Sequence, residues 1–427
     1  MLLTIALTFF ATALVGVPIA FALGLASLAA VLVSSDLPLR MIPERMAAAV
    51  DSFPLLAIPL FMLAGELMER AGILARLVEF ARSLVGHIRG GLAHVCVVSE
   101  MILSGVTGTA VGDAAALASV FLGPMKREFD EEFGAAVVAA AANIGPIIPP
   151  SAAMIVYAIM AGSSVSIAGL FLAGLVPGVL IGAGMMTLAW AMARRRGYPV
   201  TGRRPRAGAV ARATGRALPV LLMPVVVIGG MVGGVFTATE AAAVAVVYAL
   251  VVGFLVTREL RPRDLGPALV RSAITTSIVV ALIALASSVT FLLTVAQVPT
   301  AVAEWLRSVT TSPTVFLTLV MLFLLVVGMF LESNAAYIML VPILHPIALA
   351  YGIDPLHFGF VFVLNLVVGM LTPPVGVVLF VVASLSGLTL ERLVRGVWPF
   401  VLLQLAVLAL CVYAPGLYLW VPRLFGY

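Results

Sequence analysis

Small polar residues interrupt four otherwise apolar stretches of this chain, and their types are suited to binding a cation. They form two sets, which comprise Thr107, Gly108, Thr109, Asn143 and Gly145 in the first half and Glu332, Ser333, Asn334, Gly369 and Thr372 in the second. Their side-chain oxygens, together with backbone carbonyls freed by a helix break, are hard ligands that suit a small hard cation. The sequence therefore predicts two cation sites, one in each half. Close packing of small residues in membrane helices is the alternative explanation.

Prolines explain why backbone groups would be free in both halves. Residues 143–150 read Asn-Ile-Gly-Pro-Ile-Ile-Pro-Pro, and residues 369–374 read Gly-Met-Leu-Thr-Pro-Pro. Because proline lacks a backbone N–H and clashes with the preceding turn, no helix passes through either stretch unbroken. Pro149 and Pro150 correspond to Pro373 and Pro374 at the offset that also relates Gly145 to Gly369. Two apolar helices broken at matching positions indicate a transporter binding site, so we count Pro149 and Pro373 with the two sets.

Two carboxylates lie inside apolar segments, at Asp113 and Glu332. A carboxylate within a membrane is costly, so each is a candidate for a functional role. Asp113 could equally cap or orient the helices around it. Other acids are expected near helix ends, where they reach water; these are Glu66, Glu69, Glu100 and Glu240. His345 is expected to pack rather than to relay protons.

The composition places these residues in a membrane protein. The chain is 63% hydrophobic and 10% charged, whereas about 25% of the residues in a soluble domain are charged. Several apolar runs exceed the roughly 20 residues that cross a bilayer, and they do not alternate in polarity as barrel strands would. The sequence therefore predicts an all-α polytopic protein. It has no nucleotide-binding loop or catalytic elbow, so we expect neither an enzyme nor a cofactor, and an ion gradient as the driving force.

The elements that position the two polar sets occur twice. The apolar stretch 91–124 is interrupted at 104–109, and each arm is too short to cross alone, which predicts a re-entrant helical hairpin with its tip at 107–109. The stretch 313–350, interrupted at 328–334, is a second hairpin candidate. The broken helices 133–160 and 358–384 follow, and then the helices 167–193 and 397–421.

The remaining segments complete the two halves. Scaffold helices are expected at 4–33, which Gly16 and Pro18 could bend, and at 53–68. The amphipathic pattern of 69–89 favours a helix on the membrane surface over a solvated loop. Later segments are expected to be helical as well; these are the linking helix 218–235, the helices 240–256 and 272–296, and a second surface helix at 299–311.

A basic segment sets the orientation of the halves. Residues 194–216 hold eight arginines and no acid, among them Arg203 and Arg204. The positive-inside rule places this segment in the cytoplasm, and its membrane flanks argue against nucleic-acid binding. Counting crossings outward, residues 1–193 and 236–427 run in opposite directions on either side of 194–235. The sequence therefore predicts an inverted repeat, with the first hairpin entering from the cytoplasmic side and the second from the opposite side.

Six motifs in order resemble the large membrane subunit of tripartite ATP-independent periplasmic (TRAP) transporters. They are 52–61 (SFPLLAIPLF), 104–113 (SGVTGTAVGD), 144–151 (IGPIIPPS), 170–174 (LFLAG), 236–240 (FTATE) and 369–376 (GMLTPPVG). This chain has Thr107-Gly-Thr109 where the family often has Ser-Gly-Ser, Gly112 where alanine is usual and Ala238 where proline is usual. A hydroxyl remains at both tip positions.

The resemblance implies an elevator mechanism and sodium as the cation. The candidate sodium ligands are then Thr107, Thr109, Gly145, Ser333, Gly369 and Thr372. It also implies a small four-helix membrane subunit, expected as a separate polypeptide, a periplasmic solute-binding protein, and the inner membrane of a bacterium as the location. Substrates in the family are organic acids such as C4-dicarboxylates, sialic acids and keto acids. A stand-alone sodium/organic-anion symporter of related fold is the alternative.

Overall fold

A computed structural model describes residues 1–33, 37–200, 202 and 206–427. Arg203 and Arg204, counted above in the basic segment, lie outside these residues. Every regular element of the described part is a helix. Seven helices there are long and apolar enough to cross a membrane, or eight if one bent pair is counted as a single span. The prediction of an all-α polytopic membrane protein is confirmed.

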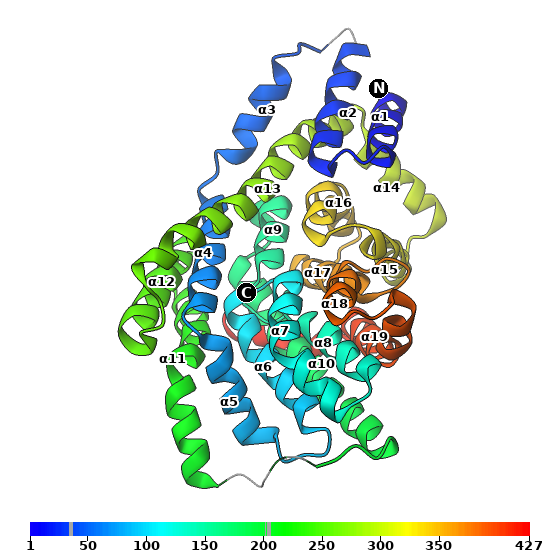
Figure 1. The fold of residues 1–427 in the computed structure, drawn as a ribbon. Coiled ribbons are helices and arrows are strands. Elements are labelled where there is room, and N and C mark those ends of the chain that lie inside the picture. Colours follow the sequence, from blue (N-terminus) through cyan, green and yellow to red (C-terminus); the bar gives the residue numbers. More distant parts are fainter. Residues whose placement is uncertain (34–36, 201, 203–205) are drawn as a thin grey trace.

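The predicted single helix at 4–33 is wrong. The chain forms α1 (Leu2–Leu14) and α2 (Ile19–Val33) instead, and Figure 1 shows these two helices side by side at one end of the molecule. Gly16 adopts a φ of +94°, a conformation that side chains disfavour, and Pro18 has no N–H to continue the first helix. The connection is therefore a turn rather than a bend.

The next helices differ from the prediction at their ends. An additional helix, α3 (Met41–Val50), precedes the 3₁₀ turn η1 (Phe53–Leu56) and α4 (Ala57–Arg70). The chain bends by 62° between α3 and this second part. The amphipathic segment is helical as α5 (Ile73–Val85), so the alternative of a solvated loop is wrong.

Both predicted hairpins and both broken helices are present. The first hairpin consists of α6 (Gly91–Thr107) and α7 (Ala110–Glu128), and the second of α15 (Pro313–Phe330) and α16 (Ser333–Ala350). The first broken helix is α8 (Glu131–Ala142) and α9 (Ala152–Ala161), which continues into η2 (Gly162–Ser164). The second is α17 (Pro355–Leu371) and α18 (Val377–Ser386). They lead to α10 (Ile167–Arg195) and α19 (Leu390–Tyr413), respectively.

The linking region is more helical than expected. The linking helix α11 (Ala207–Val232) begins before residue 218. It is followed by α12 (Ala238–Val251), which ends in the π-helical turn η3 (Val252–Thr257). The helix α13 (Pro262–Val295) begins ten residues before the predicted start, and the second surface-helix candidate is α14 (Val298–Val309). A short final helix, α20 (Gly416–Leu424), packs on α10.

The elements from α5 to α10 recur in the same order from α14 to α19. Each element of the second series begins 222 to 225 positions after its counterpart, as α8 begins at 131 and α17 at 355. In Figure 1, α5 and α14 lie toward opposite ends of the molecule, as an inverted arrangement requires. The bent α3 and α4 correspond by the same spacing to α13, which is a single helix of 34 residues.

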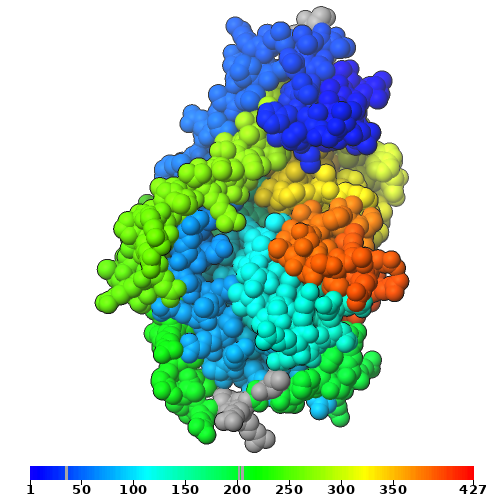
Figure 2. Space-filling view, viewed as in Figure 1, coloured from blue at the N-terminus to red at the C-terminus, as the bar shows by residue number. Residues whose placement is uncertain are grey.

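The two halves interlock through the centre. The second arm of each hairpin packs against the second part of the other half's broken helix, so α7 contacts α18 and α16 contacts α9. Figure 2 shows α7, in cyan, and α18, in orange, side by side on one face. Every residue from His357 to Leu371 of α17 is buried, as is every residue from Phe133 to Ala142 of α8. The broken helices therefore form the core.

The base of the first hairpin lies beside the start of the basic segment. Asp130, between α7 and α8, accepts hydrogen bonds from Arg196 Nη1 (3.1 Å) and from the Tyr198 hydroxyl (2.6 Å). These residues follow the end of α10, where the arginines of the basic segment begin. The first hairpin thus opens toward the end of the molecule that carries these arginines.

Candidate functional site

The tip of the first hairpin rests directly on the first helix break. The helix α6 ends at Thr107, Gly108 has a φ of +64°, and Thr109 precedes α7. A Cβ atom added to Gly108 would lie 2.8 Å from the Pro150 carbonyl oxygen and 3.2 Å from the Ala152 nitrogen. Glycine is required here both by its backbone conformation and by this approach. The structure therefore brings the predicted tip residues to the predicted break.

Hydrogen bonds of Ser151 fix the backbone of the first break. The Pro149–Pro150 peptide bond is cis, and Ser151 Oγ donates to the Pro146 carbonyl oxygen at 2.6 Å. The same hydroxyl accepts a bond from Met154 N and so caps α9. Gly174 of α10 lies against the Ile147 carbonyl oxygen, with no room for a side chain between them. The irregular backbone is therefore enclosed by protein, as a membrane requires.

Asn143 is fixed by a residue that the sequence did not single out. Its Nδ2 donates to Gln404 Oε1 at 2.7 Å, and Gln404 Nε2 donates to the Ala140 carbonyl oxygen at 3.1 Å. Both side chains are fully buried. The Asn143 Oδ1 atom has no hydrogen-bond partner in the described part of the chain. Gln404, from α19 of the other half, thus orients an amide whose oxygen stays available to a ligand.

Asp113 belongs to the same cluster. Its side chain is fully buried, and a Cβ added to Gly145 would collide with its Oδ2 atom. The Thr107 side chain and the Thr109 backbone lie within interaction range of its carboxyl group. Within the described residues neither carboxyl oxygen forms a hydrogen bond of normal geometry, although Glu100 is also within interaction range. Asp113 therefore places two carboxyl oxygens between the tip and the break.

The other acids divide into two groups. Glu69 and Glu240 are exposed, as predicted, and Glu66 forms an ion pair with Arg271 at 3.2 Å. The prediction that Glu100 reaches water is wrong, because this side chain is fully buried in α6. The prediction assumed that the end of this helix lies at the protein surface. The end of α6 lies inside the protein instead.

The second hairpin contacts the second break in a comparable way. A Cβ added to Gly369 would lie 2.6 Å from Gly328 Cα, and Gly376 N donates to the Met329 carbonyl oxygen at 3.0 Å. The Pro373–Pro374 bond is cis, like its counterpart in the first half. The Thr372 hydroxyl donates to the Val368 carbonyl oxygen at 2.7 Å, which leaves its lone pairs free.

Glu332 is the N-cap of α16. Its Oε2 accepts from the backbone nitrogens of Asn334 (3.0 Å) and Ala335 (3.3 Å). Its Oε1 accepts from Ser333 Oγ (3.2 Å) and Asn334 Nδ2 (3.0 Å). The predicted residues Glu332, Ser333 and Asn334 are thus brought together, but largely by bonds to one another. Any ligand at this tip would rely more on backbone carbonyls than a ligand at the first tip.

The helix termini at each break carry opposite partial charges. At the first break α6 and α8 end, while α7 and α9 begin. Helix C-termini favour cations and N-termini favour anions, so both kinds of ligand find a complement there. The described residues contain no group of three or more His, Cys, Asp or Glu side chains that could hold a metal ion. Side-chain and carbonyl oxygens, the ligands present here, are of the kind that suits a small hard cation.

His345 joins the two halves. Its Nδ1 lies 2.9 Å from the Tyr157 hydroxyl of α9, and its Nε2 lies 2.9 Å from Ser164 Oγ of η2. The residue is buried, as expected for packing, and both ring nitrogens are also hydrogen-bonded. Because His345 lies on α16, this link connects the second hairpin to the first broken helix.

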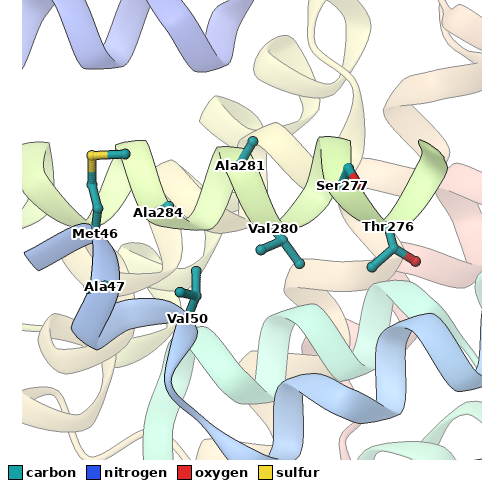
Figure 3. A pocket seen from close by; sticks show the side chains of 8 residues that line it. All are labelled: Met46, Ala47, Val50, Thr276, Ser277, Val280, Ala281 and Ala284. Carbon is teal, nitrogen blue, oxygen red and sulfur yellow. The ribbon is translucent and has the colours of Figure 1, made fainter. Parts of the chain in front are cut away.

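A hollow of about 540 Å³ lies away from both breaks, between α3 and α13 (Figure 3). It is lined by Met46, Ala47, Val50, Thr276, Ser277, Val280, Ala281 and Ala284. Its two hydroxyls already bond within the protein, Thr276 to Met62 and Ser277 to the Ala273 carbonyl oxygen. Without convergent polar groups, this surface lacks the features of a substrate site.

Comparison with known proteins gives a consistent picture. Residues 6–417 match the family model described as the tripartite ATP-independent periplasmic transporter, DctM component. The chain is 39% identical over 415 residues to the uncharacterized protein YgiK of Salmonella typhimurium, which covers 96% of this chain and 95% of that one. It is 37% identical over 417 residues to the sialic acid TRAP transporter large permease protein SiaM of Vibrio cholerae, with 96% of each chain covered.

The fold also resembles a solved structure. The crystal structure of the Alcanivorax borkumensis YdaH transporter, described as having an unusual topology, superposes with a TM-score of 0.63. The match covers 88% of this chain and 89% of that one, at 17% sequence identity. At this identity the likeness extends to the fold alone.

Proposed function

The chain belongs to the DctM component family of tripartite ATP-independent periplasmic transporters, and on this premise we propose that it imports an organic acid with sodium as the coupling ion. It is a multi-pass membrane permease, and its relatives are transporter subunits rather than enzymes. One observation carries the proposal. Each hairpin tip lies on the helix break of its own half, and at the first break the buried Asn143 Oδ1 has no hydrogen-bond partner among the described residues.

Sodium in this proposal joins the tip to the break. Thr107 and Thr109 come from the tip, and Gly145 comes from the break. A cation bound by both would hold the tip on the break, where the C-termini of α6 and α8 add favourable partial charge. At the second site the ligands are Ser333, Gly369 and Thr372, mainly through backbone carbonyls.

The substrate in this proposal is a small organic acid of the sialic acid, C4-dicarboxylate or keto acid type. Its carboxylate is taken by helix N-termini, because α7, α9, α16 and α18 all begin at the two breaks. SiaM, a sialic acid transporter by its name, supports this class. A periplasmic solute-binding protein delivers the acid, and a small four-helix subunit completes the complex in the bacterial inner membrane.

Movement in this proposal is of the elevator type. The hairpins and broken helices form the transport domain, because they interlock through α7 with α18 and α16 with α9. The helices α1 to α5 and α11 to α14 form the scaffold. The bound acid and sodium then cross the membrane together with the transport domain.

The test is uptake into proteoliposomes that contain this chain with its small subunit. Radiolabelled sialic acid, a C4-dicarboxylate and a keto acid are each presented with the binding protein outside, with and without an inward sodium gradient. Uptake is expected to require both the gradient and the binding protein. The variant Thr107→Ala is expected to raise the sodium concentration for half-maximal uptake. Thr187→Ala, an exposed hydroxyl on α10, is the control.

Three outcomes would change the proposal. Sodium-driven uptake without a binding protein would favour the stand-alone symporter. An uptake rate that is the same with and without the sodium gradient would refute sodium coupling. If uptake by Thr107→Ala and by Thr187→Ala depends on sodium in the same way, the Thr107 hydroxyl is not a sodium ligand.

A further inference from the structure

Gly112 lies on the first turn of α7, three residues after the tip residue Thr109. A Cβ atom added to Gly112 would lie 2.7 Å from Thr109 Oγ1 and 4.0 Å from Thr109 Cβ. The shorter distance is one that Cβ atoms essentially never show to another residue. Apart from its two chain neighbours, no other side chain of the described residues comes within 4 Å. The Thr109 hydroxyl therefore occupies space that exists because residue 112 has no side chain.

The position of this hydroxyl is not explained by the helix that it precedes. Thr109 is the N-cap of α7, and a threonine there usually accepts a hydrogen bond from an amide of the first turn. The Thr109 side chain makes no such capping bond. At the start of α9, by contrast, Ser151 Oγ accepts from Met154 N. The lone pairs of the Thr109 hydroxyl are therefore not used by the α7 amides and remain available to a ligand.

An alanine at position 112 would force the Thr109 side chain to rotate. Threonine has three staggered χ1 rotamers, and in two of them the hydroxyl or the methyl group points toward residue 112. An alanine excludes both, because the methyl group needs at least as much room as the hydroxyl. In the rotamer that remains, the hydrogen points toward residue 112 and Oγ1 takes the place of the methyl group. Because Gly112 is exposed and approaches only this side chain, the substitution moves the hydroxyl and spares the fold.

We propose that Gly112 is a positioning residue of the first cation site, because it leaves room for the rotamer in which the Thr109 hydroxyl binds sodium. This inference rests on the proposed sodium coupling and adds to it a residue that acts through Thr109. Both residues depart from the pattern usual in the family, and their contact makes them a matched pair. A threonine in this rotamer requires a glycine three residues later.

The test measures the sodium affinity of the purified full-length chain in lipid nanodiscs, using ²²Na⁺ in equilibrium dialysis without substrate or partner proteins. Gly112→Ala is expected to weaken the binding of one ion by about 10-fold, as is typical when a residue that orients a metal ligand is lost. Gly123→Ala, on the same helix, is the matched control, because a Cβ there meets no atom within 4 Å. It is expected to bind sodium as the wild type does. Both alanine variants should unfold at the same temperature when circular dichroism is followed.

A second substitution tests whether the effect passes through Thr109. Serine has no methyl group to place, so its hydroxyl can take either of the two positions that an alanine at 112 leaves open. Thr109→Ser combined with Gly112→Ala is therefore expected to recover most of the sodium affinity. In a Thr109→Ala background, where the hydroxyl is absent, Gly112→Ala is expected to have no further effect on sodium binding.

The outcomes separate this inference from the proposed function. A wild type that binds no sodium would refute the sodium coupling itself. Sodium binding with the same affinity in Gly112→Ala as in the wild type would overturn the role of Gly112 and leave the coupling intact. If Thr109→Ser does not recover the lost affinity, or if Gly112→Ala does not fold, the glycine is needed for packing and the inference is overturned.

Discussion

The hydrogen bonds of Gln404 offer a direct test of how the first break is held. In Gln404→Leu the side chain keeps a similar volume but loses both bonds, so Asn143 Nδ2 and the Ala140 carbonyl oxygen are left buried without partners. Each unpaired buried group costs about 1–3 kcal/mol. We therefore expect the free energy of unfolding to fall by roughly 2–6 kcal/mol, a large share of the stability of an ordinary protein.

A double-mutant cycle isolates the interaction. The free energy of unfolding is measured by steric trapping in bicelles for Gln404→Leu, Asn143→Leu and the double variant. Because the double variant leaves fewer unpaired groups, its loss should be smaller than the sum of the single losses by about 1–3 kcal/mol. The exposed Thr187→Ala should change stability by less than about 0.5 kcal/mol. Additive effects within about 0.5 kcal/mol would refute the hydrogen bond between Gln404 and Asn143.

Three further predictions use the same stability measurement or amide exchange. Gly369→Ala places a methyl group against the backbone of α15 and should cost about 1–3 kcal/mol, whereas Gly123→Ala, which meets no atom within 4 Å, should cost nothing measurable; equal losses would contradict the close approach at the second break. Glu332→Gln weakens the cap of α16 by about 0.5–2 kcal/mol and should speed hydrogen exchange of the first amides of that helix, so unchanged exchange would argue against the cap. His345→Phe leaves the Tyr157 hydroxyl unpaired at a cost of about 1–3 kcal/mol; adding Tyr157→Phe should recover part of this loss, and a further loss of full size would show that the two residues act separately.

The parts of the fold that proline and glycine chemistry dictates were predictable from the sequence. Pro149 and Pro373 remove backbone donors, so breaks at these positions follow from the residue type alone. The hairpin tip at Gly108 was predictable for a similar reason, since a small flexible residue stands between two short apolar arms. The contact of each tip with its own break then followed from the repeated order of the elements.

Other features depend on tertiary contacts that no local pattern reveals. Glu100 was expected to reach water because it lies close to a helix end, but other helices enclose that end. Gln404 lies in an apolar run of the other half, and its partnership with Asn143 joins residues 261 positions apart. The turn at Gly16 resembled a mild bend, because a glycine and a proline two residues apart are compatible with either. For Glu100 and Gln404 the deciding factor was a neighbour distant in sequence.

The matched spacing of the two halves has a consequence for how the length of this chain can change. Between a tip and its break the chain runs through two packed helices, and one inserted residue would rotate every later position on a helix by about 100°. An insertion in α7 or α8 would therefore carry the break out of register with Gly108. The turn at Gly352, between α16 and α17, has open space around it and a positive φ. Added residues there would loop outward, so fluorescent labels or affinity tags belong at such turns and not within the paired segments.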